Sequence, residues 1–396
     1  MFQFTVAPPL SLYLHIPWCI RKCPYCDFNS HEVGAPIPES RYIAALLADL
    51  DQDLPAVGDR TVETVFFGGG TPSLFSAQAI DRLLSEIRAR VTLGPGAEIT
   101  LEANPGTVDQ ERFRGFREAG VNRLSLGIQS FQPQLLQRIG RIHDHRQALT
   151  AIEAACAAGF ENINLDLMFG LPEQTTEQAL SDLQTAITLH PAHISWYELT
   201  IEPHTRFHHH PPACPDDDTL WAMQQAGRSL LSAAGYQHYE VSAYAHARRQ
   251  CRHNLNYWRF GDYLGIGAGA HGKLSDTTRQ SITRIAKTRN PDTYLATAHS
   301  RERIRTEVVL TAEDAVLEFA MNALRLDRGF TAASFSSATG LPFSLMQEPV
   351  MAAMAHGLLA NDQGRIHTTA NGQRYLNEVL QHWMTDTEHD ARTSHR

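Results

Sequence analysis

The chain has 396 residues, 43% of them hydrophobic, and its 34 basic and 43 acidic residues leave a formal net charge of −9. This apolar content supports a substantial core, in roughly two or three domains or one large α/β domain with an appendage. The acidic balance argues against a general nucleic-acid binder, which needs a basic face. The first residues, MFQFTVAPPL, lack the basic and apolar segments of a signal peptide. No apolar run reaches the roughly 18–20 residues of a membrane helix, so a cytoplasmic protein is expected.

The first half of the chain alternates short β-type runs with stretches of helical periodicity. The expected strands are Leu12–Ile16, Thr64–Phe67, Glu98–Ala103, Arg123–Ile128, Asn162–Leu167 and His193–Leu199. The expected helices are Arg41–Leu54, Ala77–Ala89, Gln110–Ala119, Arg146–Ala158 and Thr176–Leu189. This alternation predicts βαβ units and an α/β fold with a parallel sheet. The six units favour a partial (β/α)6 TIM-like barrel, although an open doubly wound sheet has the same periodicity.

The second half is less regular. Residues 208–218 lack periodicity and are expected to form an exposed loop, followed by a helix over 219–234 and a strand over 239–244. Amphipathic stretches at 312–324 and 345–355, followed by a hairpin pattern, predict a small winged-helix-like domain. The expected division is a barrel over 1–240, a connecting region over 241–300, a C-terminal domain over 301–383 and a disordered tail over 384–396.

Polar or metal-binding groups follow every one of the predicted strands. In chain order, these segments are CIRKCPYC, GGGTPS, EANP, GIQS, Asp166 before GLP, and ELT. Because ligands of parallel α/β folds bind at the carboxyl ends of the strands, these segments predict a single site at the barrel mouth.

Three of the six cysteines, Cys19, Cys23 and Cys26, have the spacing C-x3-C-x2-C. Such clustering in a cytosolic chain indicates metal binding rather than a disulfide framework. Three thiolates on one loop can hold a 4Fe–4S cube and leave its fourth iron open for a ligand. A structural zinc site with His15 or His31 is the alternative, but zinc sites more often use two C-x2-C pairs, and the sequence has no second pair.

Four polar side chains near the strand ends, Glu102, Gln129, Arg141 and Asp166, could bond a nucleoside-like ligand. Each of them could also be an ordinary structural polar group. Asp166 stands inside an apolar run, where a buried carboxylate needs partners. The glycine turn 68–70 lets the backbone approach a ligand closely, although a tight strand–helix turn would also explain it.

A second group of residues lies downstream, where 253–258 read HNLNYW and 265–272 read GIGAGAHG. A histidine beside aromatic residues can ligate haem iron while flat rings contact the porphyrin. A core histidine with packed aromatic neighbours is the alternative.

Taken together, CIRKCPYC, GGGTPS, LEANPGT, RLSLGIQSF, LDLMFGLP and HNLNYW resemble the radical S-adenosylmethionine (SAM) proteins related to oxygen-independent coproporphyrinogen III oxidase. Within that group the chain is similar to the haem-chaperone branch, over residues 10–380. The resemblance implies a partial β6/α6 barrel with a smaller C-terminal domain. It also implies a 4Fe–4S cluster on the three cysteines, with SAM beside it. The residues that it implies for SAM are Tyr13, Tyr25, Gly69, Gly70, Thr71, Glu102, Gln129, Arg141 and Asp166, and His253 is implied as an axial haem ligand.

Two departures distinguish the chain from the oxidase branch. Phe28 stands where that branch has a further cysteine, and the cysteine loop begins by residue 19, without the oxidase's long N-terminal segment. Both favour a haem chaperone over the alternative, a radical enzyme acting on a porphyrinogen, and they leave catalytic residues unassigned. Candidate partners are haem, recipient haemoproteins including membrane-associated ones, and a second copy of the chain. Ala243 stands where the chaperone-like pattern has Asn, with no assigned consequence.

Overall fold

The computed structural model describes residues 1–34 and 36–384, and a 12-stranded sheet forms its centre. The strand order is β14-β13-β12-β11-β1-β4-β5-β6-β7-β8-β10-β9, so β14 and β9 are the edges of an open sheet. Six of the strands run parallel as neighbours in chain order. They are β1 (Leu10–Ile16), β4 (Val62–Gly69), β5 (Leu93–Ala103), β6 (Arg123–Gln129), β7 (Ile163–Phe169) and β8 (His193–Glu198). All the strands predicted up to residue 199 are confirmed, as is the partial barrel.

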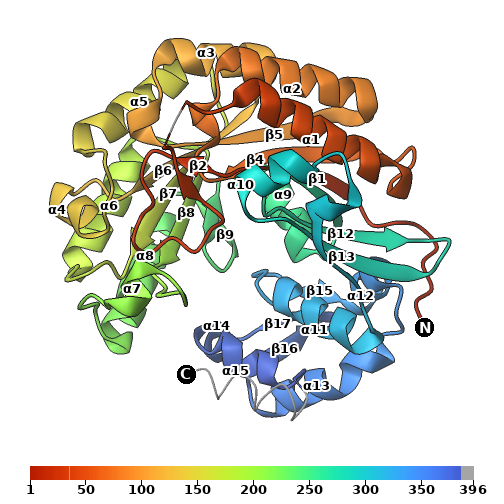
Figure 1. Ribbon diagram of the computed structural model, residues 1–396. Coiled ribbons are helices and arrows are strands. Elements are labelled where there is room, and N and C mark those ends of the chain that lie inside the picture. The colour runs from red at the N-terminus through yellow and green to blue at the C-terminus, as the bar shows by residue number, and fades with distance from the viewer. Residues whose placement is uncertain (35, 385–396) are drawn as a thin grey trace.

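Helices cover the outer side of this parallel sheet (Figure 1). They are α1 (Glu39–Asp53), α2 (Ala77–Arg90), α3 (Gln110–Ala119), α5 (His145–Ala157) and α6 (Thr176–Thr188), with a short additional helix α4 (Pro133–Arg138). Side-chain caps define several helix starts: Ser76, Asp109, Asp144 and Thr175 each accept a hydrogen bond from a backbone amide three residues onward. The five predicted helices are confirmed within two residues at either end.

The sheet continues beyond the parallel strands on both sides. Next to β1 lie β11 (Asp262–Ile266), which is parallel to it, and the antiparallel strands β12 (His271–Asp276), β13 (Ser281–Lys287) and β14 (Ile304–Val309). Next to β8 lies a hairpin of β10 (Ala243–Ala245) and β9 (Gln237–Glu240). The prediction of one strand over 239–244 was therefore wrong, because the chain turns at Val241, whose amide donates to the carbonyl of Arg325.

The loop predicted over 208–218 is shorter than expected. Helix α7 (Arg206–His209) precedes it and α8 (Asp217–Ala233) follows it. Thr205 accepts a hydrogen bond from the amide of His208, and Asp216 accepts one from the amide of Thr219. The sequence does not predict α7, and the Asp216 cap starts α8 two residues before the predicted start at residue 219.

The C-terminal part is a smaller domain with its own core. In order it contains α11 (Ala312–Ala323), β15 (Phe330–Thr331), α12 (Ala332–Thr339), α13 (Ser344–Ala355), β16 (Leu359–Asp362), β17 (Arg365–Thr368), α14 (Ala370–Arg374) and α15 (Leu376–Gln381). The helix–strand–helix–helix–hairpin order confirms the winged-helix-like prediction. Phe2 and Phe4 of the N-terminus join its core, beside Phe319 and Phe335. The predicted tail falls, from residue 385 onward, outside the described residues.

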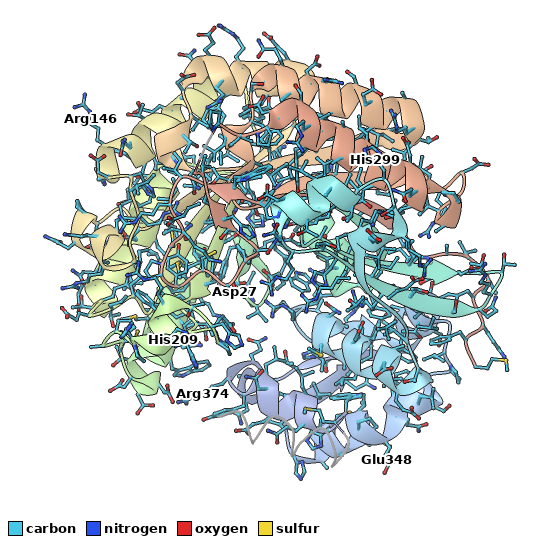
Figure 2. All side chains as sticks on the ribbon, in the orientation of Figure 1. Asp27, Arg146, His209, His299, Glu348 and Arg374 are labelled. Atoms are coloured by element: carbon cyan, nitrogen blue, oxygen red, sulfur yellow. The ribbon has the colours of Figure 1, made fainter. Side chains whose placement is uncertain are left out.

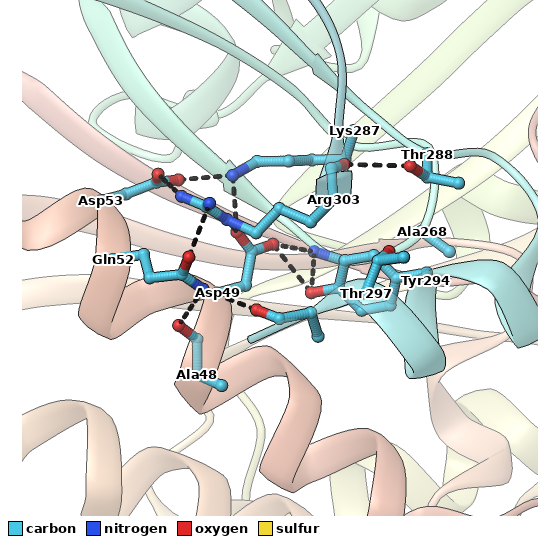
Figure 3. Close-up of polar contacts among 12 residues, drawn as sticks. Ala48, Asp49, Gln52, Asp53, Ala268, Lys287, Thr288, Tyr294, Thr297 and Arg303 are labelled. Carbon is cyan, nitrogen blue, oxygen red and sulfur yellow. Dashed lines mark hydrogen bonds and ion pairs between the residues drawn. The ribbon is translucent and has the colours of Figure 1, made fainter. Parts of the chain in front are cut away.

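A buried ion network holds α1 against the added strands (Figure 3). Lys287 Nζ lies 2.5 Å from carboxylate oxygens of both Asp49 and Asp53. The Arg303 guanidinium contacts the same two carboxylates at 2.7 and 2.5 Å. Two anions and two cations therefore balance each other in the interior, and the backbone amide of Gly267 donates a further hydrogen bond to Asp49. This network fixes the turn that follows β11. No helix in residues 1–34 and 36–384 is both long and apolar enough for a membrane span.

Candidate functional site

The cysteine loop leaves the carboxyl end of β1. Two short parallel strands, β2 (Trp18–Cys19) and β3 (His31–Glu32), close the loop at its base. Within the loop the amide of Cys26 donates to the carbonyl of Cys23 at 3.2 Å. The thiols of Cys19, Cys23 and Cys26 are unpaired and partly exposed. The local fold thus presents three free sulfur atoms on one loop at the barrel mouth.

Each of the three thiols has a polar neighbour from a different segment. Thr71 Oγ1 donates to Cys19 Sγ at 3.4 Å, and Arg141 Nη1 donates to Cys23 Sγ at 3.6 Å. Ser30 Oγ lies 3.6 Å from Cys26 Sγ. Donors to sulfur tune an iron–sulfur cluster and favour the thiolate form.

The three thiols have the chemistry of cluster ligands. In residues 1–34 and 36–384, no three His, Cys, Asp or Glu side chains converge to hold one metal ion. A 4Fe–4S cube needs a different arrangement, because each thiolate ligates its own iron. Three soft donors on a wrapping loop therefore fit such a cluster, and a cube held by three thiolates has one iron without a protein ligand.

The glycine turn after β4 packs tightly against the cysteine loop. The amide of Gly70 donates to the carbonyl of Ile16 at 2.7 Å, and a Cβ atom on Gly70 would lie 2.6 Å from the carbonyl oxygen of Trp18. Gly69 has a φ of +111°, a value that residues other than glycine rarely adopt. Close packing and backbone conformation both require glycine here.

Two carboxyl groups lie inside the barrel near its mouth. Glu102, at the end of β5, accepts a hydrogen bond from the amide of Gly69 at 3.2 Å. Burial, with the charge of Asp166 adding to it, raises the pKa of Glu102 to about 8. Burial also raises the pKa of Asp166, although hydrogen bonds from Ser125 and Asn164, both of 2.8 Å, oppose that shift. Glu102 has the less satisfied carboxyl group, as expected of one awaiting a polar ligand.

Arg141 connects three strand ends to the cysteine loop. Besides Cys23, its guanidinium reaches Asn104 Oδ1 and the carbonyl of Gly127, both at 2.6 Å. Asn104 in turn donates to Thr71 Oγ1 at 2.8 Å. Sequence reasoning gave Asn104 no role, although its position two residues after Glu102, directly beyond β5, was a signal.

Gln129 has a backbone conformation that is rare for its residue type. Its φ is +67°, at a register shift between β6 and β7, and such strain is concentrated at functional sites. The hydroxyl of Tyr197 donates to Gln129 Oε1 at 2.7 Å. Tyr197 is a second residue that sequence reasoning missed, although it stands at the end of β8.

The two predicted tyrosines lie at the edges of this region. The Tyr13 hydroxyl is 3.0 Å from His15 Nδ1, and Tyr25 packs against Phe207 with ring centroids 6.4 Å apart. The residues that the resemblance implies for SAM therefore lie on the parallel strands, on the loops at their carboxyl ends and on the cysteine loop. Their roles toward SAM stay predictions.

His253 lies deeper in the barrel than these residues. It is 1% exposed, and its ring stacks on Phe66. Nδ1 is 2.7 Å from Thr64 Oγ1, whose own proton goes to Ser11. Nδ1 must then be the donor, so the lone pair of Nε2 accepts from the Tyr257 hydroxyl at 2.8 Å. Iron ligation by His253 stays a prediction, and it would require breaking this hydrogen bond.

A cavity of about 750 Å³ opens beside the cysteine loop, a volume typical of small-molecule sites. Tyr13, Gly69 and Glu102 line its barrel side. Asp27, Phe28 and Asn29 of the cysteine loop line a second side, and residues from Tyr257 to Arg305 with Asn322 line the rest.

A larger cavity, of about 1510 Å³, lies at the opposite end of the sheet, near Pro9 and Glu63. None of the predicted site residues lines it. Size alone therefore does not identify the site, and the smaller cavity is the one that adjoins the predicted chemistry.

Comparisons with known proteins agree with this geometry. Residues 13–186 match the radical SAM superfamily, and residues 310–375 match the HemN C-terminal domain. The fold resembles that of coproporphyrinogen III oxidase from Escherichia coli, described as a radical SAM enzyme, with a TM-score of 0.80 over 96% of this chain and 91% of that one. Sequence identity to it is 23%, so this likeness concerns the fold alone.

Closer relatives share nearly the whole chain. "Heme chaperone HemW" of Haemophilus influenzae is 50% identical over 383 residues, covering 96% of this chain and 99% of the relative. The protein of that name in Escherichia coli is 48% identical over 379 residues, with the same coverage. The one in Bacillus subtilis is 34% identical over 383 residues, covering 93% and 98%. The chain therefore belongs to the HemW family of radical SAM proteins.

Proposed function

We propose that this protein is a haem chaperone, which binds haem and passes it to recipient haemoproteins while carrying a 4Fe–4S cluster and SAM. The single observation that carries the proposal is the 750 Å³ cavity beside the cysteine loop. Its walls combine aromatic rings with arginines, which suits a flat ligand that bears carboxylates. The relatives named as heme chaperones, which match almost end to end, support the same conclusion.

The site residues have distinct tasks in this proposal. Cys19, Cys23 and Cys26 would hold the cluster, which supplies an electron to the sulfonium of SAM when both are bound. The glycine turn 69–70 offers backbone groups to the methionine part of SAM, and Arg141 holds the cysteine loop against the strand ends.

The cavity residue Phe28 supports haem handling over porphyrinogen oxidation. It stands where the oxidase-like pattern has a cysteine, and its side chain is 60% exposed at the cavity. An aromatic ring there offers an apolar contact to a porphyrin but no thiol chemistry.

The alternative, a radical enzyme acting on a porphyrinogen, has one observation in its favour. The half-buried Glu102, whose pKa is raised to about 8, lies at the cavity wall, where it could hold or release a proton. Anaerobic reconstitution separates the two functions. The chaperone binds one haem per chain and leaves coproporphyrinogen III unchanged. A vinyl-bearing product from coproporphyrinogen III, with no haem bound, would instead establish the enzyme.

The proposal places the protein in the cytoplasm, where thiols stay reduced. The recipients would be haemoproteins, membrane-associated ones among them, and a second copy of the chain is a further candidate partner. Sedimentation with and without haem measures self-association. One species of 44 kDa under both conditions would remove the second copy from the proposal.

A further inference from the structure

The larger cavity, of about 1510 Å³, lies between the barrel and the C-terminal domain. Residues at the amino ends of β1 and β4 form one part of its wall, among them Pro9 and Glu63. The β9–β10 hairpin and helix α9 (Arg252–Trp258) line the barrel side, and α11, β15 and α12 line the side of the C-terminal domain. The volume exceeds the roughly 300–1,000 Å³ of small-molecule sites, so a longer ligand fits it.

Four arginines line this cavity without a carboxylate partner, and we call it the arginine cleft. Arg248 and Arg259 come from the barrel side, and Arg328 and Arg365 come from the C-terminal domain. All four are exposed, and none forms an ion pair in the part of the chain that the structure describes. Within that part, their one side-chain hydrogen bond is a long one, of 3.4 Å from Arg365 to the carbonyl of Arg328.

The two carboxylates that line the cleft are already paired. Glu63 Oε2 lies 3.0 Å from Arg252 Nη2, and Asp327 Oδ1 lies 3.4 Å from His238 Nδ1. The hydrogen bond from His238 lowers the pKa of Asp327, so that carboxylate is both ionised and occupied. The cleft therefore has an excess of positive charge in a chain whose net charge is −9. An anionic ligand would balance this charge.

Neutral donors accompany the arginines. The start of α12 lines the cleft through Thr331 and Ser334, where the positive end of the helix dipole favours an anion. Ser232 and Ser337 also line it, and their hydroxyls have no partner among the described residues. These groups can donate hydrogen bonds to carboxylates or to peptide carbonyls.

We infer that the arginine cleft binds an acidic, extended peptide segment of a partner protein, whose carboxylates pair with arginines from both sides. The planar arginine fork matches a carboxylate, and clusters of arginine are a recurring means of recognising acidic peptides. The inference does not depend on haem binding, and it gives the chain a protein-docking site at the amino end of the parallel strands.

The overall charge favours a short peptide over a nucleic acid. A net charge of −9 repels a polyanion that extends beyond the cleft, whereas a short acidic segment contacts the cleft alone. A small phosphate compound would leave most of the 1510 Å³ empty.

The position of the cleft leaves the predicted cluster site uncovered. None of residues 17–32, which form the cysteine loop, lines it. The cleft nevertheless adjoins the 750 Å³ cavity, because Trp258 and Gly261 line both. A partner docked in the cleft is therefore close to that cavity without blocking the cysteine loop.

Fluorescence anisotropy of the full-length, anaerobically reconstituted protein tests the inference. The probe is a fluorescein-labelled peptide of about eight residues with alternating Glu and Gly, and the reference probe has Gln in place of every Glu. Wild-type protein should bind the Glu peptide about tenfold or more tightly than the Gln peptide. This preference should shrink as the salt concentration rises.

Substitutions locate the binding in the cleft. Arg248→Ala/Arg328→Ala removes one arginine from each side and should weaken binding of the Glu peptide about tenfold or more. The matched control, Arg114→Ala/Arg146→Ala, removes the same charge from exposed positions on α3 and α5, where Arg146 is labelled in Figure 2, and should keep the wild-type affinity. Arg248→Glu/Arg328→Glu should instead prefer a peptide with Lys in place of Glu, a gain that misfolding cannot produce.

Three outcomes would overturn the inference. The first is equal affinity of the wild type for the Glu and Gln peptides, and the second is an equal loss of binding in the two double alanine variants. The third is displacement of the Glu peptide by inorganic triphosphate or a single-stranded oligonucleotide at equal charge concentration, with affinity lost in Arg248→Ala/Arg328→Ala, which would assign the cleft to a phosphate ligand. Each result leaves wild-type haem binding, and with it the proposed function, untouched.

Discussion

Asn29 of the cysteine loop donates a hydrogen bond from its side-chain amide to the carbonyl of Ala268, at 2.8 Å. The same amide donates to the carbonyl of Arg289, also at 2.8 Å. One side chain therefore joins the loop predicted to hold the cluster to two segments of the cavity wall. The conformation of the cysteine loop and the shape of the cavity are mechanically linked through this contact.

This link predicts that the cluster influences haem binding. Wild-type protein should bind haem several-fold more tightly with the cluster than without it. In Asn29→Ala the two affinities should converge, because the loop no longer contacts the wall. Haem titrations of reconstituted and cluster-free protein measure the difference. A difference that persisted in the variant would show that the coupling follows another route.

Only the three cysteines of the cysteine loop are predicted to be needed for binding iron and sulfide. Replacing Cys19, Cys23 or Cys26 by alanine should remove most of the bound iron and sulfide, because each thiolate ligates its own iron. Cys156→Ala, on the exposed side of α5, should leave both contents unchanged. Iron and sulfide analysis after anaerobic reconstitution is the measurement. Full iron content in all three alanine variants would contradict the cluster assignment.

The planar guanidinium group of Arg141 is predicted to hold the SAM site in shape through several contacts at once. Its Nη1 and Nη2 atoms contact the Cys23 thiol, Asn104 and the carbonyl of Gly127, a set that lysine cannot reproduce. Arg141→Lys should weaken SAM binding about tenfold, as measured by equilibrium dialysis. Arg138→Lys is the control, since that residue contacts Glu173 and the carbonyl of Pro172 and none of the cysteines. Equal SAM affinity in the two variants would argue against this role.

The buried ion network is predicted to dominate local stability. Lys287→Met leaves two buried carboxylates with one cation and should cost about 3–5 kcal/mol of unfolding free energy. Arg90→Met breaks two partly exposed surface pairs, with Asp51 and Glu86, and should cost about 1 kcal/mol or less. Urea unfolding of both variants gives the comparison, and similar losses would show that the interior network carries no special weight.

Acid should destabilise the protein through its buried histidines. Burial, with the charge of Arg123 adding to it, lowers the pKa of His253 to about 3, from its ordinary value near 6.5. The unfolded chain therefore takes up a proton first, so stability is intact above pH 6.5 and falls as the pH drops from there toward 3. His253 alone should contribute about 1.4 kcal/mol per pH unit in that window. Buried His15 and His143, whose pKa values are lowered to about 4, act in the same direction.

Unfolding curves at pH 7 and pH 5 measure this slope. His253→Gln should reduce the slope of unfolding free energy against pH by about 1.4 kcal/mol per pH unit. The exposed His299→Gln should leave the slope unchanged. Identical slopes in wild type and His253→Gln would contradict the burial of a neutral His253.

The parallel strands, their helices and the cysteine loop were predictable because their signals are local. Apolar runs such as 163–169, capping residues such as Thr175 and the spacing of the thiols each lie within a few neighbouring positions. The carboxyl-end rule then placed Glu102 and Gln129 at the same end of the sheet as the cysteine loop, without further information.

Long-range pairing was not predictable in the same way. β11 lies beside β1 although Leu12 and its partner Leu264 are far apart in the sequence, and no periodicity marks that register. For the same reason the ion pair between Asp49 and Lys287 could not be predicted from the sequence. The sequence also does not show that both ring nitrogens of His253 are hydrogen-bonded, because their partners Thr64 and Tyr257 are identified only by the folded structure.

Haem transfer tests the central claim most directly. Anaerobically reconstituted protein loaded with one haem is mixed with an apo-haemoprotein such as apomyoglobin, and the Soret bands of donor and acceptor are followed over time. A haem chaperone should lose its own band as the acceptor gains its band, at a rate that rises with acceptor concentration. Haem that stays on the protein, or that moves at a rate independent of acceptor concentration, would contradict active delivery.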